Sequence, residues 1–377
     1  MVQFTNISNC ESRKTCQPQN GKSIKRISNG FKIDESAFFL FLPTMKNSTT
    51  QKSIAGIGSA LVDILIQLKD EQLLETFQLA KGSMTLVDAQ LSQKILDASE
   101  GQDRSIETGG SAANTVRGIA RLKGTTGFIG KICDDNMGQF FKTEFEKSNI
   151  TPHLFYNDIP TGKAATLITP DSERTFGTYL GAASELKVDD LSPDLFSKYD
   201  YLHIEGYLVF NHDLIEGILK LAKAEGLKIS LDMASFNVVE ANLKFLKKLI
   251  NEYVDLVFAN EEEAKAYTGL EPEEALKVLG QQCEIAVVKI GKDGSLIQAG
   301  DQFVKVSTPQ VVSIDTTGAG DVYASGFLYG LANNFSLENC GKLGSLLASK
   351  VIQVLGAKIP DEDWPDILEI AKGLKSA

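Results

Sequence analysis

One stretch near the C-terminal end of the chain decides the fold: VSIDTTGAGDVYASGFLYG, at residues 312–330. A β-branched run that ends at Asp315 predicts a strand. Gly318 and Gly320 then interrupt the pattern, and the apolar spacing from residue 324 onward predicts a helix. Glycines at a loop-to-helix junction let backbone N–H groups converge beside the positive end of the helix dipole. The stretch therefore predicts a binding site for an anion such as phosphate.

A single acid, Asp321, stands at the start of this helix. A carboxylate repels phosphate, so Asp321 is not expected to bind the anion itself. The position of Asp321 is explained if it acts as a base, which takes the proton from a hydroxyl group that attacks the phosphate. The alternative is an ordinary glycine turn in which Asp321 only complements the helix dipole.

Composition narrows the class of protein. The chain has 377 residues, of which 43% are hydrophobic, and a formal net charge of −11. The length allows one large α/β domain or two ordinary ones, and the charge argues against a nucleic-acid partner or an anionic membrane surface. No apolar stretch is long enough to span a bilayer. Five scattered cysteines without C-x-x-C spacing indicate a reduced, cytoplasmic setting, and the three histidines lack metal-ligand spacing. His203, in an apolar run, is expected to be a core residue.

Residues 1–52 differ from the rest because they are polar, basic and low in pattern. We expect a disordered or non-native extension, with Met45 as a plausible true start. A transit peptide is the alternative, although Glu11, Asp34 and Glu35 count against it. Ordered sequence is expected from Ser53, where an apolar strand runs to Ile64.

From residue 199 onward, apolar strands alternate with helical patterns, which predicts a parallel sheet covered on both faces. Ligands bind such sheets beyond the carboxyl ends of the strands. Polar residues cluster at several predicted strand ends, at Asp232, 260–263, 291–294 and 315–321. We therefore expect these segments to meet at one edge of the sheet.

Two further segments indicate a site. Gly109 and Gly110 allow close approach of a ligand to the backbone, Ser111 is a plausible helix N-cap, and Asn114 falls in the first helical turn. Residues 160–182 predict a β-hairpin, which can serve as a lid that excludes water. Arg174, beside the hairpin turn, is a candidate to stabilise transferred charge, although an exposed turn arginine is the commoner case.

The sequence resembles the ribokinase-like (PfkB) family of sugar and nucleoside kinases over residues 53–370. The resemblance rests on Gly109-Gly110-Ser111-Ala112-Ala113-Asn114, on the 315–321 segment and on Asn260-x-x-Glu263. It implies a three-layer αβα core with a mostly parallel central sheet and a small β-sheet lid. Residues 53–377 would form the kinase domain, and parts of 58–70, 104–110 and 160–182 would form the lid.

The resemblance also implies site roles, carried over position by position. The cofactors would be ATP and Mg²⁺, with K⁺ as a further candidate. Asp321 would be the catalytic base, with Gly318, Ala319 and Gly320 as the anion hole. The implied substrate ligands are Asp63, Gly109, Gly110, Asn114 and Arg174. The implied nucleotide ligands are Asn260, Lys289, Gly291, Gly294, Gly318 and Gly320. Asn260 and Glu263 would hold Mg²⁺ through water, and Asp315 and Thr317 would hold K⁺.

The substrate is expected to be a nucleoside or ribosyl compound phosphorylated at its primary hydroxyl, because segments 58–63, 109–114 and 178–183 look most like the adenosine-kinase-like branch. The alternatives are a sugar kinase for fructose, ribose or a keto-deoxy sugar acid, and a catalytically silent sugar- or nucleoside-binding regulator. A Rossmann oxidoreductase is disfavoured, since Leu61 replaces the third glycine of G-x-G-x-x-G. Beyond its small-molecule substrate, the chain is expected to form at most a homodimer through the lid.

Overall fold

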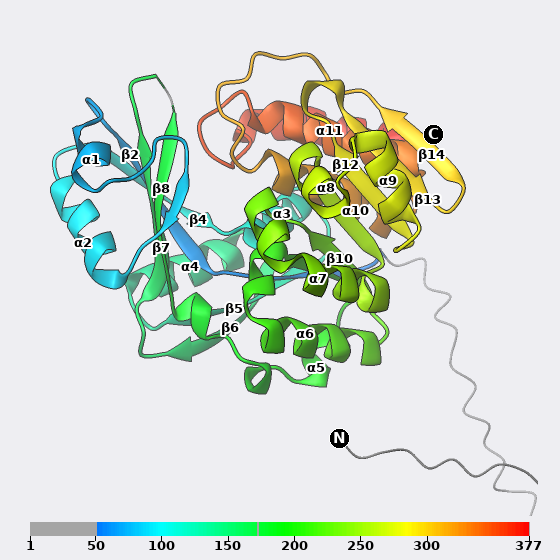
Figure 1. The fold of residues 1–377 in the computed structure, drawn as a ribbon, viewed down its shortest axis with the longest axis horizontal. Coiled ribbons are helices and arrows are strands. Elements are labelled where there is room, and N and C mark those ends of the chain that lie inside the picture. The colour runs from blue at the N-terminus through cyan, green and yellow to red at the C-terminus, as the bar shows by residue number, and fades with distance from the viewer. Residues whose placement is uncertain (1–50, 172, 377) are drawn as a thin grey trace, which may run out of the picture. The chain divides into compact units, whose positions relative to one another are not determined.

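The central feature of the structure, a computed structural model that describes residues 51–171 and 173–376, is a nine-stranded sheet in the order β14-β13-β12-β11-β10-β9-β1-β5-β6 (Figure 1). Seven neighbouring strands pair in parallel, and β13 and β14 are added antiparallel at one edge. The strands are β1 (Ile54–Ile57), β5 (Thr126–Cys133), β6 (Ile150–Asn157), β9 (Tyr201–Glu205), β10 (Lys228–Asp232), β11 (Leu256–Asn260), β12 (Ile285–Lys289), β13 (Ser295–Ala299) and β14 (Gln302–Val306). The mostly parallel sheet is confirmed.

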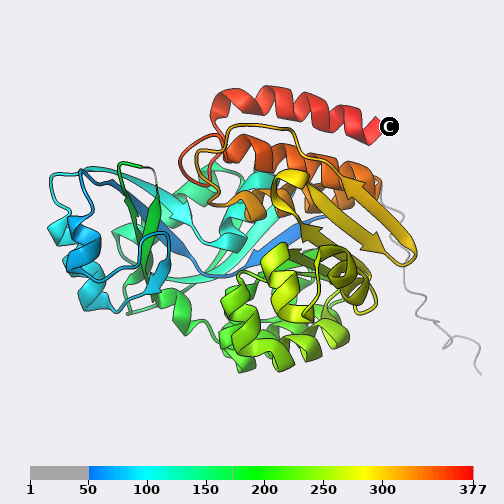
Figure 2. The same cartoon turned by 45° about the horizontal axis from the view of Figure 1, so that its top comes forward.

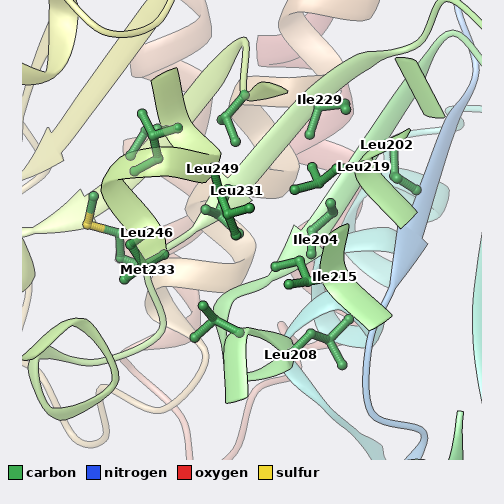
Figure 3. Close-up of a cluster of buried hydrophobic side chains, with 14 of the residues drawn as sticks. Leu202, Ile204, Leu208, Ile215, Leu219, Ile229, Leu231, Met233, Leu246 and Leu249 are labelled. Carbon is green, nitrogen blue, oxygen red and sulfur yellow. The ribbon is translucent and has the colours of Figure 1, made fainter. Parts of the chain in front are cut away.

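Helices cover both faces of this sheet because its strands are apolar on both sides. In β11, Val257 packs into one hydrophobic cluster while Phe258 packs into the cluster on the opposite face. Figure 3 shows part of the first cluster, in which Leu202, Ile229 and Leu231 from the strands meet leucines and isoleucines from the helices. The helices on this side are α5 (Pro193–Phe196), α6 (His212–Ala224), α7 (Phe236–Tyr253), α8 (Glu261–Thr268) and α9 (Pro272–Gly280). Those on the other side are α3 (Ser111–Arg121), α4 (Asn136–Lys147), α10 (Ala319–Ala332), α11 (Leu337–Val351) and α12 (Trp364–Ser376).

A second, five-stranded sheet stands beside the central one, in the order β3-β8-β7-β2-β4. Its strands are β2 (Leu61–Gln67), β3 (Met84–Leu86), β4 (Asp103–Gly109), β7 (Thr161–Ile168) and β8 (Arg174–Gly181), and α1 (Gln72–Thr76) and α2 (Ala89–Ala98) accompany it. The expected hairpin is β7–β8. Figure 2 shows the blue β1–β2 segment passing from the central sheet to this smaller sheet.

Three local expectations were wrong. Residues 53–64 form two strands in different sheets, because the chain leaves the central sheet between β1 and β2. Residues 307–318 form a loop without strand structure, so Asp315 does not follow a strand. The N-cap of α3 is Gly110 instead of Ser111, which is the first helical residue.

The structure tests the expectation for His203 but not the expectation for the N-terminal segment. His203 is fully buried and Nδ1 bonds to Ser230 Oγ at 3.0 Å, as expected of a core residue. The expectations for residues 1–50 lie outside the described residues. Among the helices that the structure describes, none combines the length and apolar character needed to cross a membrane.

Candidate active site

A cavity of about 740 Å³ lies at the carboxyl ends of β10, β11 and β12 and at the starts of α3 and α10. Most of the predicted site residues line it. They are Gly110, Asn114, Asn260, Glu263, Lys289, Gly291, Gly294, Thr317, Gly318, Ala319, Gly320 and Asp321. Met84 and Phe176, from the second sheet, and Tyr207 add an apolar part to its wall. The sheet-edge prediction is thus supported, because segments up to about two hundred residues apart in sequence face one space.

The glycine loop before α10 is shaped by its own backbone and by a neighbouring loop. Gly318 is the helix N-cap with a left-handed φ of 72°, which favours glycine. A methyl group on Gly318 would lie 2.5 Å from the Ala357 side chain. Upstream, the N–H groups of Ile314 and Asp315 both donate to the carbonyl of Ile352, at 2.7 and 3.2 Å. The first turn of α10 lines the cavity at Ala319, Gly320 and Asp321. Helix-start N–H groups lack partners within the helix, an arrangement that can bind an anion, although the N–H of Ala319 already donates to the carbonyl of Thr316 at 3.2 Å.

Asp315 lies behind this loop and does not line the cavity. Its Oδ1 accepts the N–H of Thr317 at 2.9 Å, and its Oδ2 accepts the N–H of Gly356 at 2.8 Å. Arg174 Nε lies 2.9 Å from the same Oδ2, and both side chains are buried. Arg174 is thus not an exposed turn residue. It starts β8 and connects the second sheet to the glycine loop.

Asp321 has two hydrogen-bond donors from α3. Ser111 Oγ donates to Oδ1 at 2.7 Å, and Asn114 Nδ2 donates to Oδ2 at 2.9 Å. Burial raises the pKa of Asp321 to about 7, although both donors act in the opposite direction. A carboxyl group with this pKa can accept a proton near neutral pH. Ser111 was expected only as a cap, and its direct contact with Asp321 was missed.

Asp63 and Gly109 are diagonal neighbours in the β2–β4 pair, where Asp63 lies opposite Glu107 and Gly109 opposite Leu61, and neither lines the cavity. A Cβ at position 109 would lie 2.2 Å from Asp63 Oδ1, so a larger residue there would have to displace the Asp63 carboxylate. Burial, with Glu107 as a smaller cause, raises the pKa of Asp63 to about 6, against the influence of Arg117. Gly110 is likewise restricted, because its φ is 100° and a Cβ would meet the carbonyl of Ser59 at 2.2 Å.

Asn260 and Glu263 form a capping box at the start of α8. Asn260 Oδ1 accepts the N–H of Glu263 at 2.8 Å, and Glu263 Oε2 accepts the N–H of Asn260 at 2.7 Å. Burial raises the pKa of Glu263 to about 7, and neighbouring Asp232 adds to the rise. The pair is therefore rigid and locally satisfied, with both residues on the cavity wall.

Lys289, at the end of β12, brings positive charge to the glycine loop. Its Nζ lies 3.0 Å from Asp232 Oδ2, and a methyl group on Gly320 would lie 2.9 Å from the same Nζ. Burial alone would lower the pKa of Lys289, but the carboxylates of Asp232 and Glu263 outweigh it and raise the pKa. Lys289 therefore remains charged beside the glycine loop.

Gly291 and Gly294 follow β12 with positive φ angles of 56° and 99°. A Cβ at Gly294 would lie 1.9 Å from the carbonyl of Val306, so its conformation is required for β13 to pair with β14. Gly291 has open space around it. Both line the cavity at the end that also contains Lys289.

Glu205 is a buried residue that the sequence analysis overlooked. Its Oε1 accepts the N–H of Ser59 at 2.7 Å, and its Oε2 accepts the N–H of Ala112 at 3.2 Å. It therefore holds the β1–β2 crossover against the start of α3. The available signal was an acid at the end of the predicted strand 201–204, the same pattern that indicated Asp232.

No direct metal site is formed within residues 51–171 and 173–376, where no three His, Cys, Asp or Glu side chains converge suitably. Asn260 and Glu263 line the cavity, and amide and carboxylate oxygens are donor types that suit a hydrated Mg²⁺, which binds with several of its waters retained, although the side-chain oxygens of this pair already accept hydrogen bonds within it. Asp315 fits K⁺ poorly, because its carboxylate already has two N–H donors and the Arg174 guanidinium.

Comparison with known proteins agrees with this geometry. An adenosine kinase from Sinorhizobium meliloti superimposes with a TM-score of 0.77 at 32% identity, covering 85% of this chain and 100% of that one. A 5-dehydro-2-deoxygluconokinase from Geobacillus kaustophilus is 30% identical over 264 residues, which are 65% of this chain and 78% of the relative. Adenosine kinase 2 of Arabidopsis thaliana is 25% identical over 335 residues, 82% of this chain and 96% of the relative. The family model for pfkB family carbohydrate kinases matches residues 79–364, and the chain therefore belongs to that family of phosphotransferases that act on alcohol groups.

Proposed function

We propose that the chain transfers the γ-phosphoryl group of ATP to the primary hydroxyl of a nucleoside or ribosyl substrate. One observation carries the proposal: Asp321, with a pKa raised to about 7, stands in the first turn of α10 directly after the glycine loop. A proton acceptor and an anion site thus lie next to each other, as phosphoryl transfer to a hydroxyl requires.

Asp321 accepts the hydroxyl proton while the hydroxyl oxygen forms a bond to the γ-phosphorus. The bond from that phosphorus to the ADP oxygen breaks, so the products are ADP and a phosphate monoester. The N–H groups at the start of α10 and the ammonium group of Lys289 stabilise the negative charge on the transferred group. Mg²⁺, held through water by Asn260 and Glu263, would neutralise phosphate charge when bound.

The substrate end of the cavity contains hydrogen-bonding groups and an apolar wall. Gly110 and Asn114 line the cavity, where they can contact sugar hydroxyls, although the amide of Asn114 also bonds to Asp321 and Arg117. Asp63 would contact only a ligand that extends beyond the cavity to the β2–β4 pair. Met84 and Phe176 approach from the second sheet, which supports a role for that sheet as a lid. An apolar wall suits the flat base of a nucleoside.

A sugar acid is one of the alternative substrates, and the charge of the cavity disfavours it. A substrate carboxylate needs a free cation, whereas the lysines lining the cavity within the described residues are Lys289 and Lys292. Lys289 is paired with Asp232. We place both lysines, Lys289 and Lys292, at the nucleotide end of the cavity. Arg174, also inferred to bind substrate, is paired with Asp315. We therefore assign Arg174 to the positioning of the glycine loop.

The proposal also includes a cellular location and an oligomeric state. Cys133, Cys283 and Cys340 are free thiols, which agrees with a cytoplasmic location. The edge strands β3 and β4 expose Met84, Leu86 and Ile106, so the second sheet is the surface we assign to a homodimer. A change of molar mass in the Ile106→Lys variant, measured by light scattering, tests the dimer.

The function is tested by release of ADP with Mg²⁺ against a panel of nucleosides, free sugars and keto-deoxy sugar acids, with Asp321→Asn as the matched control. Turnover with nucleosides that Asp321→Asn abolishes supports the proposal. Turnover only with a sugar or sugar acid keeps the kinase and overturns the substrate. Ligand binding without ADP release from any compound identifies a catalytically silent binding protein. Running each assay with and without K⁺ shows whether that ion is required.

A further inference from the structure

Arg117, on α3, contacts the site through Asn114. Its Nη2 donates to Asn114 Oδ1 at 2.7 Å, and the other end of that amide, Nδ2, donates to Asp321 Oδ2 at 2.9 Å. A guanidinium group can only donate hydrogen bonds, and an ionised carboxylate can only accept them. An amide between the two therefore has one favourable orientation, with its oxygen toward Arg117 and its nitrogen toward Asp321.

We propose that Arg117 is a positioning residue, which holds the Asn114 amide so that its N–H₂ group always faces Asp321. This inference rests on the proposed function, in which Asp321 is the base and Asn114 contacts the substrate. Without Arg117, rotation of the amide by half a turn would place its oxygen against the carboxylate, where the two acceptors repel each other.

The guanidinium is itself fixed by two other segments. Its Nη1 donates to the carbonyl and the hydroxyl of Thr108, at 2.8 and 2.7 Å, and its Nη2 also donates to the carbonyl of Ala357 at 3.2 Å. Thr108 lies at the end of β4 in the second sheet, and Ala357 packs against Gly318. The lid strand β4 and the loop at Ala357, which packs against the glycine loop, thus fix the position of Arg117. Arg117 in turn fixes the orientation of Asn114. Lysine has one nitrogen and cannot span these four acceptors.

The charged neighbours of these groups come from several elements. Burial lowers the pKa of Arg117. The carboxylates of Glu107, Asp63 and Asp321 raise that pKa, and Arg121 lowers it. Asp232 raises and Lys289 lowers the pKa of Asp321, while burial and then the charge of Asp321 raise the pKa of Tyr207. Since substitution of Arg117 leaves all of these groups in place, a shift of the Asp321 titration reports loss of the Arg117 charge and of the Asn114 donor.

The test uses full-length protein labelled with ¹⁵N-asparagine, in which the Asn114 side-chain resonance is identified by its loss in Asn114→Ala. In the wild type this resonance should titrate with Asp321, with a midpoint near pH 7. In Arg117→Met the midpoint should rise by about one unit, since a donor and a nearby cation are lost. The pKa of the acidic limb of the kcat/KM pH profile should rise by the same amount. In Arg117→Lys, both values should lie between those of the wild type and those of Arg117→Met. Arg121→Met is the matched control, because Arg121 lies on the same helix, pairs with Asp361 and stacks on Trp364. It should change neither readout.

The amide readout needs no turnover, so it separates failure of this inference from failure of the proposed function. If the wild type phosphorylates nothing in the panel, the function is wrong, while the titration still tests Arg117. A double-mutant cycle with Asn114→Ala should show that Arg117→Met has much less effect once the amide is gone. The inference is overturned if Arg117→Met keeps the wild-type midpoint of the Asn114 titration. It is also overturned if the variant lowers only thermal stability and kcat/KM without shifting the pKa of the acidic limb. If Arg117→Met does not fold, the same criteria apply to Arg117→Lys.

Discussion

Replacement of Asp321 by asparagine should inactivate the enzyme and, at alkaline pH, stabilise the fold. The pKa of Asp321 rises from 3.8 to about 7, mainly through burial. The folded state therefore binds this proton more tightly than the unfolded chain does. That stabilisation is fully present below the unfolded pKa of 3.8 and is lost as the pH rises through about 7.

The size of the effect follows from this shift. About three pKa units correspond to about 4 kcal/mol of unfavourable ionisation above pH 7, which asparagine removes. Two effects reduce the gain. One of the two donors, Ser111 or Asn114, loses its acceptor, at a cost of about 1 kcal/mol. Partial exposure of Asp321 to the cavity also screens its charge. We therefore expect a net gain of about 2 kcal/mol above pH 8 and none near pH 5.

The assay is urea unfolding of the wild type and Asp321→Asn at about pH 5 and about pH 8.5, together with ADP release. Turnover should fall about 10²–10⁴-fold, the usual loss for a positioned base. Asp366→Asn is the matched control, because Asp366 is an exposed acid in the first turn of α12. If Asp321 only complemented the dipole of α10, its substitution would cost stability at alkaline pH, by about 0.3–1 kcal/mol. That result, or near-wild-type turnover, would refute our reasoning.

Three further substitutions test the surroundings of the site. Arg174→Met leaves Asp315 buried and without its cation, so unfolding in urea should show a loss of about 3–5 kcal/mol, and an unchanged midpoint would contradict the ion pair. Gly318→Ala places a side chain at a φ of 72° beside a crowded loop, so the KM for ATP should rise at least tenfold, whereas a wild-type KM would argue against the anion site. Lys289→Met removes the ammonium group next to Asp232, and we expect kcat to fall about 10²-fold, with equilibrium nucleotide binding as the second readout. A variant that binds ATP and turns over normally would exclude a role for Lys289 in charge stabilisation.

Several features of the site could be predicted because they are local in sequence. The capping box of Asn260 and Glu263 needs only two residues three apart at a helix start. The left-handed Gly318 and the start of α10 follow from the glycine pattern and the apolar spacing. Long-range pairing was not accessible in the same way, since Ser111 and Asp321 are separated by 210 residues. Nothing in either local sequence specifies that partner.

The expected strand before Asp315 shows where local pattern misleads. β-branched residues favour extended backbone, and an extended segment becomes a strand only where a neighbouring strand is available. At Ile314 and Asp315 the available acceptor was the carbonyl of Ile352, just after α11, so the segment became a loop. The sequence by itself determined the alternating elements and placed Asp321 at the start of a helix that follows a glycine loop. Only the tertiary structure decided which donors reach that carboxylate and which cation Asp315 holds, because those partners come from separate elements that packing brings together.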